Sequence, residues 1–358
     1  MIVMHSTSRW TKVLTLSLLL SAVAPPAFAD RVASQVAAPS PSASSTQTGA
    51  NNKTKDSKAV AAERKELFDK ISLVTGIPWS FLAAVDQYEK TMNTVKKRTV
   101  QLTLVNIYFS EATWSGMLNP NQLDTNPRSI AFFHGYGRDG SGDLIADKSN
   151  DIDVLAAMSE ILSKNGVNQD NLQTNIANYY HNPRSVLRIN QFAAIYEKLG
   201  TLDVNEHAFP LPVTSDYSYR STWGDSRGWG GHRIHEGTDL FAGYGVPVRS
   251  TCYGIVEEKG WNPYGGWRIG IRDLNNIYHY YAHLSGYQKG IKPGDIVKPG
   301  QTLGWVGSSG YGKPGTSGKF PPHLHFGLYR DNGSKEWSFD PYPSLRRWER
   351  EDQQRRKK

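Results

Sequence analysis

Two histidines separated by a single residue, His323 and His325, give the first indication of chemistry in this sequence. On a β-strand, residues two apart face the same side and lie roughly 6–7 Å apart, so both side chains can project into one site. Further upstream, His235 and Asp239 are four positions apart. Two histidines and one aspartate make a three-ligand set that suits a catalytic zinc ion, whose fourth position is left for water. The chain has one cysteine, which excludes a cysteine-rich structural zinc site.

The spacing of His235 and Asp239 restricts the backbone between them. On a straight strand the two residues would be about 13 Å apart, too far to share a metal ion. A helix would bring them within roughly 6 Å, but Gly237 and the strand-like residues after it argue against a helix. We therefore predict a sharp bend at Gly237, because glycine can take backbone angles that other residues avoid.

Short β-like runs separated by Gly and Pro follow one another after residue 206, and they contain all of these residues together with His283. This pattern predicts a compact antiparallel β domain. We expect its strands at 246–248, 254–257, 268–271, 277–282, 302–306 and 323–328. Each of the two metal-binding motifs is common by chance, but their joint presence in one β domain makes both more significant.

Four segments of this region resemble, in the same order, the LytM/lysostaphin-type zinc metallopeptidases of peptidase family M23: HEGTDLFAGYGVPV, YYAHLSGY, IKPGDIVKPGQTLGWVGSSG and PPHLHFGLY. The resemblance covers roughly residues 210–343 and implies an antiparallel β fold of the duplicated-hybrid-motif type. It implies that the zinc ion (Zn2+) is held by His235, Asp239 and His325. It also implies that His283 and His323 are the catalytic pair, and that the substrate is the peptide stem or cross-bridge of bacterial peptidoglycan.

The catalytic pair can do acid–base chemistry near neutral pH. An imidazole takes or gives a proton in this range, and a protonated ring can stabilise the oxyanion of a tetrahedral intermediate. We expect His323 to orient the water and His283 to stabilise the oxyanion. The sequence alone leaves the reverse assignment open.

Residues 59–206 have a helical texture, with apolar residues at helical spacing. We expect helical segments at 79–88, 100–109, 153–162 and 186–199. The stretch 76–89 is similar to lysozyme-type, lytic transglycosylase-like domains, in which an acidic residue at the end of such a helix is the general acid. Glu89 stands at that place, but the Gly-rich motif expected after it is absent. We therefore interpret Glu89 as a solvated or capping residue of a spacer or glycan-binding domain.

Part of a calcium-binding EF-hand pattern is present in this domain, with loop positions 1, 3, 5 and 9 occupied by Asp139, Ser141, Asp143 and Asp147. The glycine position is taken by Leu144 and the glutamate position by Asn150. An Asp- and Gly-rich surface turn is the interpretation that we favour, and a calcium site is the alternative.

The N-terminus has the features of an export signal. Arg9 and Lys12 precede an apolar run of about eleven residues, too short to span a bilayer, and a small-x-small signal-peptidase site follows at 27–29. We predict a cleaved signal peptide over 1–29, a disordered linker over 30–58, and a secreted or cell-wall location without a stable transmembrane anchor. The formal charge of +8 then favours the polyanionic cell wall, and not nucleic acid, as the partner.

Together these features predict a multidomain α + β protein, with a helical domain over 59–206, a zinc metallopeptidase domain over 207–343 and a basic tail over 344–358. The layout of the whole chain resembles the sporulation-associated L-Ala–D-Glu endopeptidases, which implies stem-peptide cleavage in cell-wall or spore-cortex remodelling. Two other functions stay open. One is a non-hydrolytic cell-wall-binding or scaffold protein, and the other is a glycan-cleaving transglycosylase that works through Glu89.

Overall fold

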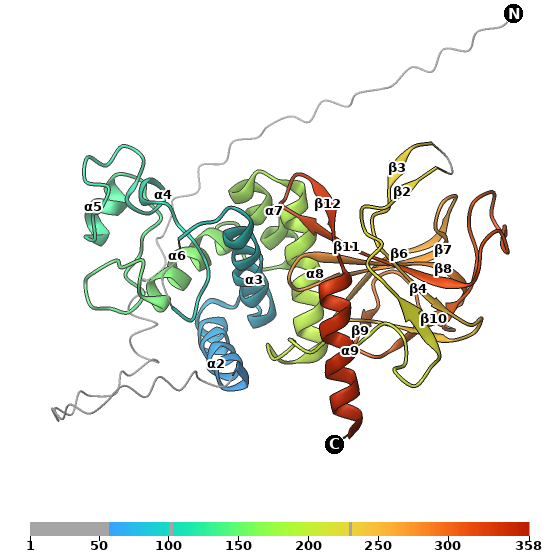
Figure 1. The fold of residues 1–358 in the computed structure, drawn as a ribbon. Helices are drawn as coiled ribbons and strands as arrows, with labels where there is room; N and C mark the ends of the chain where they lie inside the picture. Colours follow the sequence, from blue (N-terminus) through green and yellow to red (C-terminus); the bar gives the residue numbers. More distant parts are fainter. Residues whose placement is uncertain (1–56, 100–102, 229–230, 358) are drawn as a thin grey trace, which may run out of the picture.

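The computed structural model describes residues 57–99, 103–228 and 231–357, and it shows a helical part beside a β part (Figure 1). The predicted signal peptide and nearly all of the predicted linker lie outside the described residues. Of the helices that are described, none combines the length and the apolar content that a membrane crossing requires.

The helical part consists of α2 (Ser57–Thr75), α3 (Trp79–Val95), α4 (Glu111–Ser115), α5 (Pro127–Phe132), α6 (Asp151–Ser163), α7 (Gln169–Tyr180) and α8 (Pro183–Leu199). Asparagine side chains accept backbone N–H groups at the starts of α5, α6, α7 and α8, because a helix leaves its first N–H groups without partners of its own. Most residues of α3 are buried, and this helix packs against α2 and α8.

The helix predicted over 100–109 is wrong. The described residues 103–109 are not helical, and alternate side chains are buried, namely Val105, Ile107 and Phe109. A burial period of two is typical of an extended chain and not of a helix. The carboxylate of Asp151 accepts the N–H groups of Leu104 and Val105, at 3.1 and 2.9 Å, and so supplies partners that a helix would otherwise provide.

The β part contains the strands β1 (Tyr217–Tyr219), β2 (Ser226–Arg227), β3 (Arg233–Ile234), β4 (Thr238–Ala242), β5 (Pro247–Arg249), β6 (Gly254–Asn262), β7 (Gly266–Asp273), β8 (Ile277–Tyr287), β9 (Ile296–Val297), β10 (Thr302–Val306), β11 (His323–Asp331) and β12 (Glu336–Phe339). The large sheet has the order β1-β4-β11-β8-β7-β6-β9 and its pairs are antiparallel. β12 lies beside β11, β10 pairs with β5 and β8, and β2 and β3 form a separate hairpin. Each of the six predicted strands overlaps an observed one.

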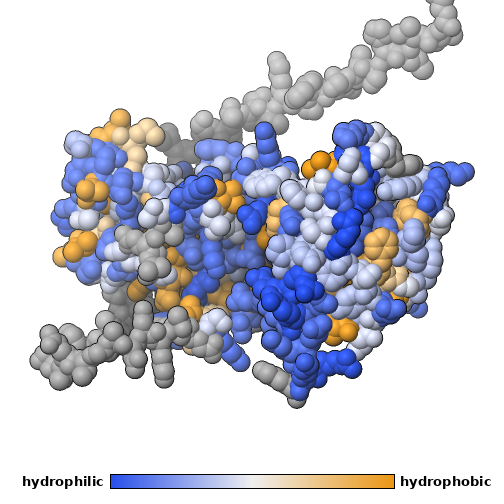
Figure 2. Space-filling view, in the orientation of Figure 1, coloured by the Kyte–Doolittle hydropathy of each residue, from blue (hydrophilic) through white to orange (hydrophobic). Residues whose placement is uncertain are grey.

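The segment predicted as a basic tail lies in helix α9 (Tyr342–Lys357) as far as it is described. Leu345 and Trp348 of this helix are buried in the same hydrophobic core as the sheet residues Leu240 and Phe326. These apolar residues are three apart, so one stripe of the helix faces the sheet while its arginines face solvent. Figure 2 shows the hydrophilic outer face of α9 and, at the far edge of the helical part, apolar side chains around α4 and α5.

The helical part and the β part share an apolar interface. Ile255 and Leu274 come from the β part but belong to the hydrophobic core of the helices. In addition, the buried side chain of Gln87 on α3 donates a hydrogen bond to the carbonyl of Leu274 at 2.7 Å. Because these contacts are buried, separating the two parts would expose apolar surface and leave polar groups without partners.

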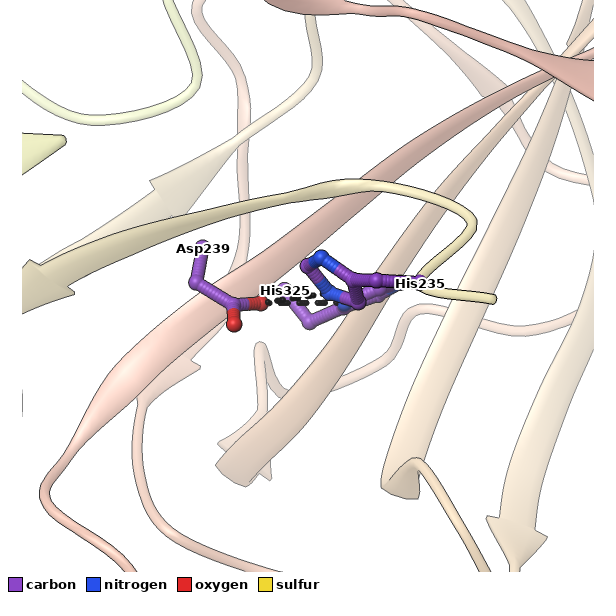
Figure 3. A group of neighbouring side chains, drawn as sticks. All are labelled: His235, Asp239 and His325. Carbon is purple, nitrogen blue, oxygen red and sulfur yellow. Dashed lines mark hydrogen bonds and ion pairs between the residues drawn. The ribbon is translucent and has the colours of Figure 1, made fainter. Parts of the chain in front are cut away.

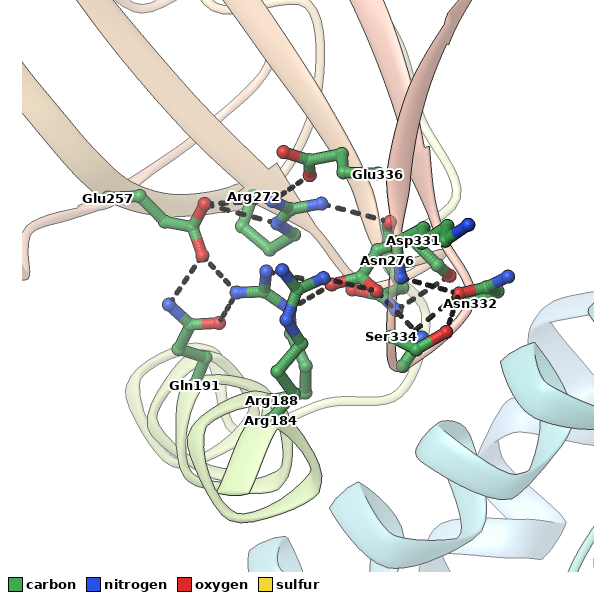
Figure 4. A network of polar contacts seen from close by, with 12 residues as sticks. Arg184, Arg188, Gln191, Glu257, Arg272, Asn276, Asp331, Asn332, Ser334 and Glu336 are labelled. Atoms are coloured by element: carbon green, nitrogen blue, oxygen red, sulfur yellow. Dashed lines mark hydrogen bonds and ion pairs between the residues drawn. The ribbon is translucent and has the colours of Figure 1, made fainter. Parts of the chain in front are cut away.

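A network of charged side chains extends this interface from α8 to the sheet (Figure 4). Arg188 donates hydrogen bonds to Asp331 at the end of β11, at 3.0 and 3.2 Å, and also pairs with Glu257 on β6. Glu257 in turn accepts a hydrogen bond from Arg272 at 3.0 Å. The Arg188 side chain is only 8% exposed and that of Asp331 is fully buried, so each charge depends on its partner for solvation.

Removal of the Arg188 guanidinium tests this dependence. The Arg188→Met variant leaves Asp331 buried without its main cation, and we expect the free energy of unfolding to fall by about 3 kcal/mol in urea denaturation. The control is Arg184→Met, because Arg184 is 42% exposed and makes a single 3.3 Å contact with Asp331. The control should lose less than about 1 kcal/mol. Equal losses in the two variants would contradict the role given to burial.

The same network predicts how stability depends on pH. Burial tends to raise the pKa of Glu257, but Arg272 and Arg188 outweigh it and hold this pKa below its ordinary value of 4.5. Burial likewise opposes ionisation of Asp331, but the N–H of Gly333 and the Arg188 side chain hold its pKa below 3.8. The stabilisation is therefore fully present above these ordinary values and is lost as the pH falls through the lower folded-state values. The free energy of unfolding of the wild type, measured in urea at several pH values, should therefore lose the contribution of these two carboxylates only below about pH 4.5.

Candidate metal centre and groove

The register between β4 and β11 brings Asp239 directly opposite His325 (Figure 3). The Oδ1 atom of Asp239 lies 3.1 Å from Nδ1 of His325. His235, which lies between β3 and β4, reaches the same point, with its Nε2 atom 2.8 Å from His325 Nδ1 and 3.1 Å from Asp239 Oδ1. Three potential ligand atoms from two distant segments of the chain thus converge on one centre.

Thr222, which precedes the β2–β3 hairpin, holds the bend that carries two of these residues. Its carbonyl lies 2.7 Å from Nδ1 of His235, so that nitrogen donates a proton and Nε2 presents its lone pair to the centre. The Thr222 hydroxyl accepts the N–H of Asp239 at 3.1 Å and donates to the carbonyl of Gly237 at 3.4 Å. No motif in the sequence pointed to this threonine.

The predicted bend at Gly237 is present, but the reason given for the glycine is wrong. The φ angle of Gly237 lies outside the left-handed region, so the backbone conformation does not demand glycine. A Cβ atom at this position would instead lie 2.6 Å from Cε1 of His325 and 2.6 Å from the carbonyl oxygen of Phe326. The glycine is required because the imidazole of His325 occupies the space of its missing side chain.

Arg227 on β2 binds the second carboxylate oxygen of Asp239. Its guanidinium lies 2.6 Å from Oδ2, which leaves Oδ1 directed at the two histidines. Burial disfavours ionisation of Asp239, but its hydrogen bonds with His235 and His325 outweigh burial and hold the pKa of the carboxyl well below its usual range. Asp239 is therefore a carboxylate. Sequence reasoning did not identify Arg227, because only the folded hairpin brings it beside β4.

The donor atoms of this centre fit a zinc ion. Two imidazole nitrogens and a carboxylate oxygen are ligands that zinc takes, and the three atoms lie within 4.8 Å of one another. Burial lowers the pKa of His325, so its ring is neutral, which is the form that binds metals. The Nδ1 contact of His235 and the Arg227 contact of Asp239 fix the orientation of two of the three ligands, as is usual around metal ions.

His283 enters the site through an irregularity of β8. Ile269 pairs with Tyr281 and Trp267 with Leu284, so β8 has one more residue than β7 between these pairs. This is a β-bulge, and it includes His283, whose φ of 65° lies in the left-handed region. The backbone N–H of His283 donates to the carbonyl of Gly265 at 2.7 Å. The bulge turns this side chain to the same face as Tyr278 and Tyr280, which regular alternation would not allow.

His283 and His323 are held in the same way. Nδ1 of His283 lies 2.7 Å from the carbonyl of Ser309, and Nδ1 of His323 lies 2.8 Å from the carbonyl of Pro321. In both rings Nδ1 is therefore the donor, and Nε2 is free to accept a proton. Burial, reinforced at His283 by the neighbouring His323 and His325, lowers the pKa of both rings, and that of His283 the more strongly. The two ring centres are 4.8 Å apart.

A groove with a volume of about 700 Å³ runs over the metal centre and contains all five predicted site residues in its lining. Its walls include aromatic rings from four different segments, namely Phe241, Tyr264, Tyr280 and Phe320. Phe320 lies 4.6 Å from the ring of His283 and Phe241 lies 5.2 Å from that of His323, between ring centres. An extended peptide could lie along this groove with a carbonyl group over the metal centre.

Comparison with known proteins assigns the chain to a family. Residues 233–341 match the sequence pattern of peptidase family M23. The L-Ala–D-Glu endopeptidase of Bacillus subtilis (strain 168) is 57% identical over 299 residues, which is 83% of this chain and 92% of that protein. The chain belongs to peptidase family M23.

Two solved structures are similar to a part of this chain. The catalytic domain of lysostaphin from Staphylococcus simulans is 33% identical and covers 39% of this chain and 99% of its own, with a TM-score of 0.32. A zinc-containing peptidase from Vibrio cholerae is 29% identical and covers 37% of this chain and 39% of its own, with a TM-score of 0.30. The family description does not extend to the helical part, whose lysozyme-like character stays a prediction.

Glu89 is placed in the interior of the helical part. Glu89 is only 4% exposed, and its Oε2 atom lies 3.2 Å from Nη1 of Arg98. Burial raises the pKa of Glu89 even though Arg98 opposes the shift. The expectation of a solvated glutamate is therefore wrong, and the side chain lacks the open surface on which a general acid would meet a polysaccharide.

The loop after Gly137 brings together the carboxylates of Asp139, Asp143 and Asp153. Asp139 accepts backbone N–H groups from Gly142 and Leu144, at 2.7 and 2.9 Å. Asp153 likewise accepts the N–H groups of three loop residues. These bonds close a surface turn in the way that aspartates do in the absence of a metal ion, and they favour the turn that we predicted.

The close approach of Gly237 to His325 leads to a prediction about metal affinity. In Gly237→Ala the new methyl group would displace the imidazole, and we expect the affinity for zinc to fall at least about 10-fold in competition with a chelating dye. Gly243→Ala is the matched control, since a Cβ at this nearby glycine meets nothing within 4 Å. Unchanged zinc affinity in Gly237→Ala would show that the ring has room that the structure does not contain.

Proposed function

We propose that this chain is a zinc-dependent endopeptidase that hydrolyses the L-Ala–D-Glu bond in the stem peptide of bacterial peptidoglycan. The observation that carries the proposal is the 57% identity to the Bacillus enzyme of that name across 92% of its length. The convergence of His235, Asp239, His325, His283 and His323 on one groove supports the same activity. We also propose that the chain is exported and acts in cell-wall or spore-cortex remodelling.

His235, Asp239 and His325 would hold the zinc ion. When bound, zinc polarises a carbonyl group and lowers the pKa of a water molecule towards neutrality. The chain itself contributes fixed orientations. The carbonyl of Thr222 holds His235, Arg227 holds Asp239, and the missing side chain of Gly237 makes room for His325.

His283 and His323 would move the protons. At neutral pH the Nε2 atom of each ring is an acceptor, because Nδ1 donates to a backbone carbonyl. We assign to His323 the removal of a proton from the attacking water, since its Nε2 lies 3.7 Å from Asp239 Oδ1 and thus beside the metal centre. The proton that His323 takes from the water would pass to the leaving nitrogen as the C–N bond breaks. For His283 to donate to the developing oxyanion, its Nε2 atom would first have to take up a proton, which its lowered pKa disfavours in the free protein.

Digestion of purified peptidoglycan tests this function. With zinc supplied, mass spectrometry should detect fragments with new C-terminal L-Ala and new N-terminal D-Glu, and a chelator should prevent their release. His325→Ala should reduce the release to the level seen with chelator. His323→Ala should slow it by about 100- to 10,000-fold, the usual contribution of a general acid or base. Glu89→Gln should release the same fragments as the wild type.

Two results would replace this function with another. Intact peptidoglycan after incubation with zinc-loaded protein would favour a non-hydrolytic wall-binding protein. Release of anhydro-sugars that Glu89→Gln abolishes and His325→Ala does not would favour a glycan-cleaving enzyme.

A further inference from the structure

Most charged side chains that line the groove are already paired with an opposite charge. Arg227 pairs with Asp239 at 2.6 Å, and Arg268 pairs with Glu258. Glu336 pairs with Arg272 at 2.6 Å. These groups have their charges compensated within the protein, so they add little net attraction for a charged substrate.

Arg233 on β3 differs from the other arginines of the groove lining. It makes no ion pair with any residue in the described part of the chain, and its Nε atom is buried without a hydrogen-bond partner there. Its guanidinium instead lies over the ring of Tyr264, with 5.1 Å from Cζ to the ring centre. An arginine stacked in this way keeps the N–H groups along its edges available to a ligand.

The position of Arg233 places this positive charge near the catalytic residues. Tyr264 directly precedes Gly265, whose carbonyl accepts the N–H of His283 at 2.7 Å. Arg233 also acts electrostatically on Tyr280, whose ring centre is 5.8 Å from that of His325. The guanidinium of Arg233 therefore lies on the groove wall near His283 and His325, and not at a remote end of the groove.

The chemistry of the proposed substrate supplies an anion at a matching place. When the amino group of a glutamyl residue forms the scissile bond, two carboxyl groups remain on that residue. Only one of these two carboxyl groups forms the peptide bond to the next residue of the stem. The other stays a free carboxylate within a few bonds of the scissile nitrogen, and a carboxylate is the group that the fork of an arginine binds best.

We propose that Arg233 is a specificity-determining residue that binds the free carboxylate of the D-glutamyl residue next to the scissile bond. The inference rests on the proposed L-Ala–D-Glu endopeptidase function. Arg233 then selects a glutamyl over an amidated or neutral residue on the leaving side of the bond. Without the substrate carboxylate, the positive charge of Arg233 would stay uncompensated, so the site discriminates against neutral residues.

Glu236 also lines the groove, and its negative charge would repel the substrate carboxylate that Arg233 attracts. It is exposed, and its described partner is the hydroxyl of Tyr329 at 3.5 Å. An exposed carboxylate is well solvated, and its repulsion of a substrate anion is weakened by water and salt. Arg233 is only half-exposed and has a buried edge, so its contact with a carboxylate is the stronger of the two interactions.

Two synthetic stem peptides test the assignment, one with the free glutamyl carboxylate and one with the same carboxyl as a primary amide. The zinc-loaded wild-type chain should cleave the acid with a kcat/KM about 10- to 100-fold above that for the amide, the range for one charge-assisted contact. Arg233→Gln should lose this preference, because kcat/KM for the acid falls while that for the amide stays within about 3-fold. Arg233→Lys should retain a part of it.

Controls separate this effect from a general loss of charge or of structure. Arg220→Gln removes the same charge from a nearby side chain that is 76% exposed and does not belong to the groove lining, and it should keep the wild-type preference. Zinc content and thermal midpoint should be the same in Arg233→Gln and the wild type.

The possible failures are distinguishable. An equal loss for both peptides in Arg233→Gln, or retention of the preference, would overturn the role of Arg233 while leaving the endopeptidase function intact. Cleavage of both peptides by the wild type at the same rate would also overturn the role of Arg233 and leave the endopeptidase function intact. Failure of the zinc-loaded wild type to cleave either peptide would overturn the proposed function, and the role of Arg233 with it.

Discussion

The candidate metal centre depends on one constraint, the antiparallel register between β4 and β11. Asp239 and His325 are paired residues of these two strands, so their side chains leave the sheet on the same face and at the same level. A slip of one residue would turn one of the two side chains to the opposite face. The leucines beside them, Leu240 and Leu324, are fully buried on that opposite face and penalise such a slip. The hydrophobic core thus fixes the geometry of the polar site.

Backbone carbonyl groups then decide how the histidines are used. Thr222, Ser309 and Pro321 each present a carbonyl to Nδ1 of a different imidazole, namely those of His235, His283 and His323. Since each contact fixes the proton on Nδ1, each ring offers Nε2 to the groove. Carbonyl groups of a packed β domain move little, so the rings are oriented before substrate arrives.

The helical part supports the site from a distance. None of its described residues belongs to the groove lining, but Arg188 on α8 binds Asp331 at the end of the strand that begins with His323. It also binds Glu257 on β6, so one arginine joins two strands of the sheet to the helices. The helical part therefore stabilises the end of β11, the strand that carries His323 and His325.

The sequence by itself predicted five residues that the structure places in one groove, because zinc ligands and proton carriers must be particular residue types, and their spacing and order resemble a known family. It also predicted six of the strands of the β part, since short β-like runs between turns need little context, but it did not predict the others, such as β4. Only the tertiary structure decided that Gly237 makes room for His325, that a bulge turns His283 inwards, and that Thr222 and Arg227 orient the ligands. It likewise decided that 103–109 is extended and that α9 joins the β core. These features arise from contacts between distant segments, which local spacing does not encode.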